Sequence, residues 1–160
     1  MAQLPGVSDD RGSKPQKILF DMCCDIYGQN NVYWELMIPD LGQRFDIFIK
    51  HLGVAIEFDG RQHTEYVPHF HKDECGYIAS IKRDSTKSDW ANTNGIAIVR
   101  FNDSNIPNNV DSLKSIVSNS IIDSDYSFEC FTASQNKTLA DARAYRKQQY
   151  LNMKHNDRRK

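Results

Sequence analysis

The sequence predicts an α/β domain: a mixed sheet of about four strands flanked by helices, in the order αβββαβα, with a basic C-terminal helix or tail. Two observations predict this class. Apolar residues recur at helical spacing in two segments, and between them lie four short runs rich in Val, Ile and Phe. The chain has 160 residues, of which 39% are hydrophobic and 26% are charged. This is the size and composition of one globular domain with a sizeable core.

The first half of the chain predicts one helix followed by three strands. The helix has an apolar stripe that ends at Gly28 and consists of Ile18, Leu19, Met22, Cys23 and Ile26. The strands are NVYWELMIP, QRFDIFIK and GVAIEFDG, and the short HLG connection predicts a hairpin between the second and the third. The third strand is almost continuously apolar, which indicates a central position with both faces covered.

The second half predicts a helix, a strand and a further helix. The first helix extends from Tyr77 to about Asn94, with Gly95 as its stop, and IAIVRF follows as a short buried strand. The second helix carries an apolar stripe of Val110, Leu113, Ile116, Val117 and Ile121.

The C-terminal segment predicts a linker and then a basic helix. DSDYSFECFTASQNK has no clear period, whereas LADARAYRKQQYLNMK is typical of a helix, with Thr138 as its N-cap. The chain therefore divides into a flexible N-terminus over 1–14, a core over 15–125, and a linker with a basic helix or tail over 126–160.

The charge distribution indicates a polyanionic partner. Residues 137–160 contain eight Lys or Arg and two Asp, a net +6, so the remaining 136 residues carry −7 of the chain's net charge of −1. A solvated terminus is the alternative explanation for the basic segment. The candidate nucleic-acid contacts are Arg83, Arg143, Arg146, Lys147, Tyr150 and Lys154.

Membrane and secretory functions are not expected. No apolar run approaches the roughly 18 residues that a membrane span requires, and the N-terminus lacks the apolar region of a signal peptide. The four cysteines form no CxxC pair. Reduced thiols in the cytoplasm are the simplest interpretation.

Three carboxylates are expected to share one small site. In AIEFDGRQH, Glu57 and Asp59 face the same side of a strand, because side chains alternate along it. Asp46 lies on the preceding strand, and the hairpin brings it near residues 57 to 59. Like charges so placed repel unless a cation neutralises them. Oxygen ligands favour a hard divalent ion, Mg²⁺ first, with Mn²⁺ as the alternative. Gly60 lets the chain turn sharply, and His63 returns toward the site.

The following helix adds a positive charge. Arg83, Lys87 and Trp90 share one of its faces, and Lys87 is placed to reach the carboxylates. Carboxylates on a metal ion, together with a Lys or His near a phosphate, are the equipment of metal-assisted phosphodiester hydrolysis.

These residues resemble the PD-(D/E)XK nuclease superfamily. RFDIFI, GVAIEFDGRQH and IKRDSTKSDWANTNGIAIVRF follow its order, and are similar to the branches of the very-short-patch repair endonuclease and of phage homing endonucleases. The resemblance covers residues 15 to 102. It implies a restriction-endonuclease-like core and a Mg-dependent DNA endonuclease of homing, repair or phage DNA processing. The host would be a bacterium or a phage-infected cell.

The resemblance also implies roles for single residues. Asp46 and Glu57 would be metal ligands. Asp59 occupies the place of the motif lysine, and we count Asp59 as a third metal ligand. His63 would be the active-site histidine. Lys87 would replace the missing lysine, as migrated lysines do in this superfamily, and the choice between His63 and Lys87 stays open. These five residues are the predicted catalytic set.

Structural roles are the alternatives for the acidic residues. Asp46 and Glu57 would then form salt bridges at the strand edge, for example with Arg44 or Lys82, and Asp59 would be a turn residue. The alternative function is a catalytically inactive nucleic-acid-binding module of the same fold. The target sequence, nicking against double-strand cutting, and monomer against homodimer all stay open.

A structural zinc site is not expected. Relatives of the repair type carry zinc near this region, and His63, His69, His71 and Cys75 are candidate ligands. The H-x-H-x₃-C spacing of His69, His71 and Cys75 supplies no clear fourth ligand, because His63 is only nearby and Cys130 is remote in sequence. His63 is alternatively an ordinary loop histidine.

Overall fold

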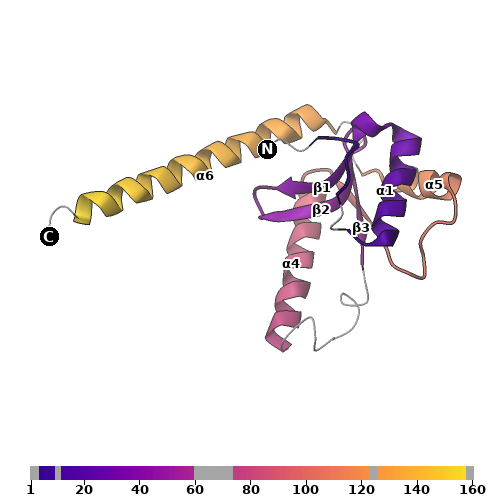
Figure 1. Cartoon of the computed structure of the whole chain (residues 1–160), viewed down its shortest axis with the longest axis horizontal. Helices are drawn as coiled ribbons and strands as arrows, with labels where there is room; N and C mark the ends of the chain where they lie inside the picture. The colour runs from indigo at the N-terminus through magenta and orange to yellow at the C-terminus, as the bar shows by residue number, and fades with distance from the viewer. Residues whose placement is uncertain (1–3, 10–11, 60–73, 123–125, 158–160) are drawn as a thin grey trace.

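A computed structural model describes residues 4–9, 12–59, 74–122 and 126–157 (Figure 1). Its elements are α1 (Lys14–Tyr27), the 3₁₀ turn η1 (Gln29–Asn31), β1 (Val32–Ile38), β2 (Gln43–Ile49), β3 (Val54–Phe58), α4 (Glu74–Thr93), β4 (Ala97–Phe101), α5 (Val110–Ser120) and α6 (Phe128–Asp157). The predicted α/β class is confirmed.

The four strands form one mixed sheet in the order β1-β2-β3-β4. β1 pairs with β2 and β2 pairs with β3 in antiparallel fashion, whereas β3 and β4 run parallel, with α4 as the crossover between them. The predicted β2–β3 hairpin is confirmed, and so is the central position of β3. A parallel neighbour requires such a crossover, since a tight turn reverses the chain.

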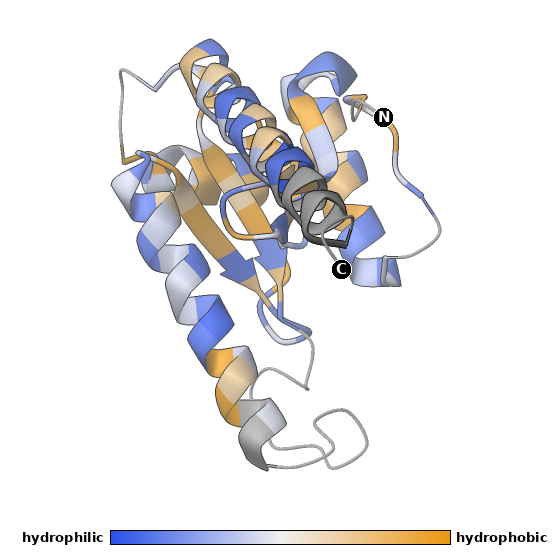
Figure 2. Ribbon diagram, turned by 90° about the vertical axis from the view of Figure 1, so that its left-hand side faces the viewer, coloured by the Kyte–Doolittle hydropathy of each residue, from blue (hydrophilic) through white to orange (hydrophobic). Residues whose placement is uncertain are grey.

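Helices cover both faces of the sheet (Figures 1 and 2). On one face, α1 and α5 bury Leu19, Leu113 and Val117 against alternate strand residues such as Ile47 and Ile56. The other face carries α4 and the first turns of α6. Its buried cluster comprises Leu36, Ile38, Phe45, Phe48, Ala55, Ala91, Ile96 and Phe131. The functional side chains described below lie on this second face.

The alternation of β1 side chains between the two faces of the sheet reverses at Glu35. Trp34 packs in the α1 and α5 cluster, yet Leu36, two residues later, packs in the α4 and α6 cluster. Glu35 has a φ of 48°, a left-handed conformation that is uncommon outside glycine. The ladder register pairs Trp34 with Ile47 and Leu36 with Phe45. The irregular position is therefore Glu35, opposite Asp46 on β2.

α6 differs from the sequence prediction. One helix of 30 residues begins at Phe128, so residues 128–137 of the segment predicted as a linker are helical. Thr138 is not an N-cap but an interior residue, whose Oγ1 donates to the Ser134 carbonyl at 3.3 Å. The helix begins earlier because Ser127 Oγ accepts from the Cys130 amide at 3.4 Å and because Phe131, 9% exposed, anchors the first turns in the core.

The rest of α6 extends away from the domain as an arm (Figure 1). We call residues 138–157 of α6 the arm. None of its described side chains is buried. No helix in the described parts of the chain has the length and apolar character needed to span a membrane.

The described part of the N-terminal segment lies along β1. Gly6 donates its amide proton to the Val32 carbonyl at 2.7 Å, and Trp34 Nε1 donates to Asp9 Oδ1 at 3.2 Å. A Cβ at Gly12 would stand 2.2 Å from the Trp34 ring, so the backbone touches this side chain directly. Residues 1–14 were expected to be flexible, and these contacts tie their described part to the sheet.

Candidate active site

A buried ion pair forms the centre of the site. Lys87 of α4 places Nζ 2.6 Å from Glu57 Oε2 on β3, and the two side chains are only 9% and 7% exposed. Lys87 Nζ also donates to the Arg44 carbonyl at 3.0 Å and lies 5.9 Å from the centre of the Phe45 ring. The prediction that Lys87 reaches the carboxylates is confirmed, and the ring and carbonyl explain how its ammonium tolerates burial.

Asp46 lies beside this pair on β2. The register pairs Ile47 with Ile56, so the next position along the hairpin sets Asp46 against Glu57. Its Oδ2 accepts the Phe58 amide proton at 2.9 Å. Burial raises the pKa of Asp46, although the Phe58 hydrogen bond and the charge of Lys87 act in the opposite direction. Asp46 is thus held by the backbone at a break in the strand pairing.

Glu57 is only partly satisfied by its surroundings. Burial, followed by the charge of Asp46, raises the pKa of Glu57 from 4.5 to about 7, and Lys87 limits this rise. Oε2 is bound by Lys87, but Oε1 is buried without a hydrogen-bond partner among the described atoms. A buried acceptor without a donor is costly, so this oxygen marks the point where a ligand would be stabilised.

Asp59 is engaged elsewhere. Its Oδ1 accepts from Arg100 Nη1 on β4 at 3.0 Å, and its amide donates to the Phe101 carbonyl at 2.7 Å. Arg100 also pairs with Asp84 of α4 at 3.1 Å. The structure therefore brings Asp46 and Glu57 together with Lys87, while Asp59 forms a separate ion pair at the end of β3.

Several predicted residues fall outside the description. His63, His69 and His71 belong to residues 60–73, which lie outside the described chain. Cys75 lies on α4, but its side chain is also outside the description. Within the described ranges, no group of three or more His, Cys, Asp or Glu side chains is arranged to hold a metal ion.

The donor set fits a hydrated hard cation. Asp46 offers a carboxylate, and Glu57 offers the unpartnered Oε1 next to it. Mg²⁺ is commonly bound through one or two carboxylates and keeps several waters. Mutual repulsion between the two carboxylates raises the pKa of Glu57, and a divalent cation would remove that repulsion. Asp46 and Glu57 are therefore the described residues that could hold the ion.

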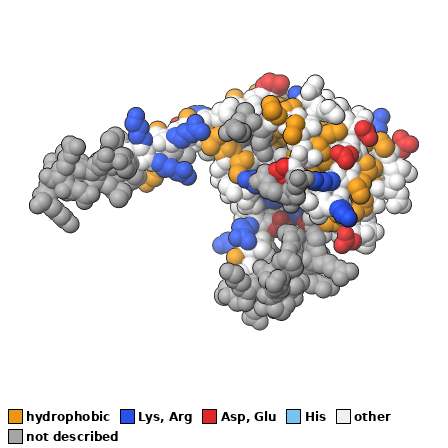
Figure 3. Space-filling model, in the orientation of Figure 1, with side chains coloured by type: hydrophobic (Ala, Val, Ile, Leu, Met, Phe, Trp, Pro, Cys, Tyr) orange, Lys and Arg blue, Asp and Glu red, His pale blue; other side chains and the backbone are white. Residues whose placement is uncertain are grey.

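The candidate nucleic-acid contacts fall in two places. Arg83 is exposed on α4, and its carbonyl accepts from Gln43 Nε2 at 3.4 Å. Arg143, Arg146 and Lys147 are exposed on the arm, where Figure 3 shows Lys and Arg side chains gathered. The remaining two candidates, Tyr150 and Lys154, are also on the arm, but their side chains are outside the description.

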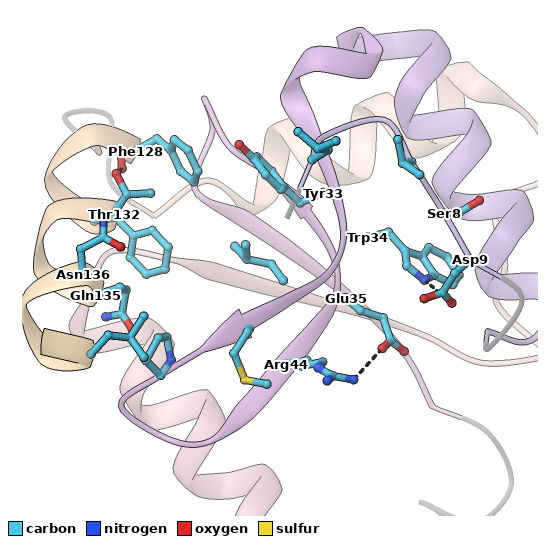
Figure 4. A pocket seen from close by; sticks show the side chains of 17 residues that line it. Ser8, Asp9, Tyr33, Trp34, Glu35, Arg44, Phe128, Thr132, Gln135 and Asn136 are labelled. Carbon is cyan, nitrogen blue, oxygen red and sulfur yellow. Dashed lines mark hydrogen bonds and ion pairs between the residues drawn. The ribbon is translucent and has the colours of Figure 1, made fainter. Parts of the chain in front are cut away.

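A hollow of about 880 Å³, which the sequence did not predict, lies next to the site (Figure 4). The N-terminal segment, β1 and the first turns of α6 line it. The Arg44–Glu35 ion pair, at 3.1 Å, is part of its wall, and the Arg44 carbonyl binds Lys87. Gln135 Oε1 is buried there without a hydrogen-bond partner among the described atoms. The Arg44 backbone thus connects the hollow to the carboxylate site.

Sequence reasoning missed Glu35 and Arg100. Glu35 raises the pKa of Asp46 through its charge, but nothing in VYWELMI marks its irregular backbone. Arg100 left a signal: it is the charged residue in the short buried strand IAIVRF, and such a residue needs a partner. That signal could have been combined with Asp59, which follows the third predicted strand, and with Asp84 on the next predicted helix.

Comparison with known proteins gives one distant, partial likeness. No family model matches the chain, and no solved structure matches it. A curated protein of Invertebrate iridescent virus 6, described as "Uncharacterized protein 307L", is 30% identical to the chain over 54 residues. The match covers 34% of this chain, and the chain spans 27% of the viral protein.

Proposed function

We propose that the chain is a metal-dependent DNA endonuclease that hydrolyses phosphodiester bonds, with Mg²⁺ or Mn²⁺ as its cofactor. The observation that carries this proposal is the buried Lys87–Glu57 pair beside Asp46, with one Glu57 oxygen unpartnered. An acidic pair next to a buried cation supports phosphoryl chemistry, because it serves a metal ion and an anionic phosphate in one place. The role in homing, repair or phage DNA processing is part of the same proposal.

Asp46, Glu57 and Lys87 would have distinct tasks in this proposal. Asp46 and Glu57 would hold the ion, which when bound would neutralise phosphate charge and lower the pKa of a water. Lys87 opposes the rise in the pKa of Glu57, so it keeps this carboxylate available as an anion. An ammonium has three donors and no acceptor, and Lys87 Nζ donates to Glu57 Oε2 at 2.6 Å and to the Arg44 carbonyl at 3.0 Å. Its third N–H would be available to a phosphate oxygen.

The basic arm supports DNA as the substrate. Phosphate contacts dominate non-specific affinity for DNA, and residues 137–160, which comprise the arm together with Lys137 and the three basic residues after it, carry a net +6. The rest of the chain is acidic, so the attraction to DNA would come from the arm, from Arg83 and from the bound ion. His63 keeps its predicted place in the catalytic set, outside the described residues.

The decisive experiment is incubation with supercoiled plasmid, with and without Mg²⁺. We expect the wild type to relax or linearise the plasmid with Mg²⁺ and to leave it intact in EDTA. Asp46→Asn, Glu57→Gln and Lys87→Met should abolish or strongly reduce cutting. Lys82→Met is the matched control, because Lys82 is exposed on the same helix. A wild type that never cuts with Mg²⁺ or Mn²⁺ would refute the proposal, and so would full activity in the three site variants.

Two observations favour the alternative, a nucleic-acid-binding module without catalysis. Asp59 is tied to Arg100, and the described residues hold no three-member ligand group. Such a module would bind DNA equally in EDTA and in Mg²⁺ and would not cut. A filter-binding or anisotropy titration in both buffers, run beside the plasmid assay, separates the two functions.

A further inference from the structure

Arg100 joins three elements beside the candidate active site. It lies opposite Glu57 in the parallel register of β3 and β4. Nη1 donates to Asp59 Oδ1 at 3.0 Å and lies 3.1 Å from Asp84 Oδ2. Nη2 donates to Asp84 Oδ1 and to Ser88 Oγ, both at 3.2 Å. One side chain on β4 thus holds the end of β3 and the middle of α4.

The arrangement depends on a guanidinium. A planar fork of donors binds two carboxylates and a hydroxyl at once, whereas an ammonium is a compact point charge. Burial alone would lower the pKa of Arg100, but Asp59 and Asp84 raise it, so both carboxylates stabilise the cation. The side chains of Arg100 and Asp59 are 30% and 20% exposed, which shields their interaction partly from water.

The two α4 partners of Arg100 flank Lys87. Asp84 and Ser88 are one helical turn apart, and Ser88 Oγ donates to the Asp84 carbonyl at 3.0 Å. Fixing these two residues against β4 fixes the rotation of α4 about its own axis. That rotation decides whether Lys87 Nζ lies 2.6 Å from Glu57 or points elsewhere.

We propose that Arg100 is a positioning residue that clamps α4 to β3 and β4, so that Lys87 stays on Glu57 and Asp59 stays apart from the carboxylate pair. Its meaning for catalysis rests on the proposed nuclease function, but the clamp can be tested without cleavage. The hydrogen bonds and ion pairs of Arg100 to described residues go to Asp59, Asp84 and Ser88, not to Asp46 or Lys87. Arg100 positions Lys87 through Asp84 and Ser88, and its charge also lowers the pKa of Glu57 directly.

The clamp itself is tested by a double-mutant cycle in urea unfolding. Lys87→Met should lower the urea midpoint of the wild type, because it leaves Glu57 buried without its partner. In an Arg100→Met background the same substitution should lower the midpoint less, since the pair is already loosened there. Lys82→Met should shift both backgrounds equally. Equal shifts for Lys87→Met in both backgrounds would overturn the clamp.

A second variant, Asp84→Asn, tests the clamp even if Arg100→Met does not fold. Asp84→Asn removes only the α4 side of the clamp, and it should also reduce the effect of Lys87→Met on the urea midpoint. If Arg100→Met does not fold, the Asp84→Asn cycle decides the question by the same criterion. A full, unreduced effect of Lys87→Met in the Asp84→Asn background would overturn the clamp.

Cleavage kinetics then test whether the Arg100 clamp supports catalysis. Arg100→Met should lower kcat for plasmid by about 100-fold, the effect of a displaced catalytic group, with KM little changed. Arg100→Lys should not restore kcat, because an ammonium cannot bridge both carboxylates. A change in KM alone would make Arg100 a DNA contact and overturn its positioning role. If the wild type never cuts, the nuclease proposal fails, and the unfolding cycle still decides the clamp.

Discussion

Glu57 should make the stability of the metal-free protein fall as pH rises. Its pKa is about 7 in the folded state, against an ordinary value of 4.5. Between pH 4.5 and pH 7 the folded state therefore binds a proton that the unfolded state has released. The stabilising contribution is complete below about pH 4.5 and is lost as pH rises through 7. From pH 5 to pH 8, the linkage relation gives a loss of roughly 2 to 3 kcal/mol in the free energy of unfolding.

The assay is urea unfolding at pH 5 and pH 8 in EDTA, for the wild type and for Glu57→Gln. The variant cannot titrate at this position, so its free energy of unfolding should fall by roughly 2 to 3 kcal/mol less over the same interval. Asp103→Asn is the control, because it removes an exposed carboxylate and should keep the wild-type pH dependence. Identical pH dependence in the wild type and Glu57→Gln would refute the argument that burial and Asp46 perturb this carboxyl.

Three further predictions concern the arm, the core and a turn. Deleting residues 137–160 should flatten the salt dependence of DNA affinity, measured in Ca²⁺ to block cutting; if three phosphate contacts are lost, the log–log slope falls by about 2.7. Phe131→Ala should cost about 3 to 5 kcal/mol in urea unfolding, because its ring packs on Phe48 and Trp90, with ring centres 5.8 and 6.0 Å away. Gly53→Ala should destabilise by more than the roughly 1 to 2 kcal/mol of a left-handed alanine, since its Cβ would stand 2.7 Å from the Tyr126 ring.

Each of these three predictions has a control variant or an outcome that would contradict it. Gly42→Ala is the match for Gly53→Ala, because Gly42 has a φ of +63° but nothing within 4 Å of a Cβ. Equal destabilisation by both would exclude the clash with Tyr126. Leu139→Ala is the match for Phe131→Ala, since Leu139 is 38% exposed; equal costs would show that α6 is not anchored by Phe131. Unchanged salt slopes after the deletion would make the arm a solvated terminus.

The order of helices and strands was predictable from sequence because apolar spacing is a local signal. The Lys87–Glu57 pair was predictable in part: a buried carboxylate needs a cation, and the following helix offered one. The start of α6 was not predicted, because the apolar residues of its first turns show no clear helical period and its cap at Ser127 lies in a polar stretch. The Arg100–Asp84 contact joins two elements through tertiary packing, which no short-range pattern encodes.

The arm sets a length scale for any contact with a duplex. From residue 138 to residue 157 the helix extends about 30 Å at 1.5 Å per residue, and a base pair occupies about 3.4 Å of duplex. An arm lying along DNA would therefore cover about nine base pairs. Because the arm leaves the domain in one direction, a monomer with the proposed nuclease function would protect the DNA unequally on the two sides of the target bond. A footprint would reveal which side faces the arm.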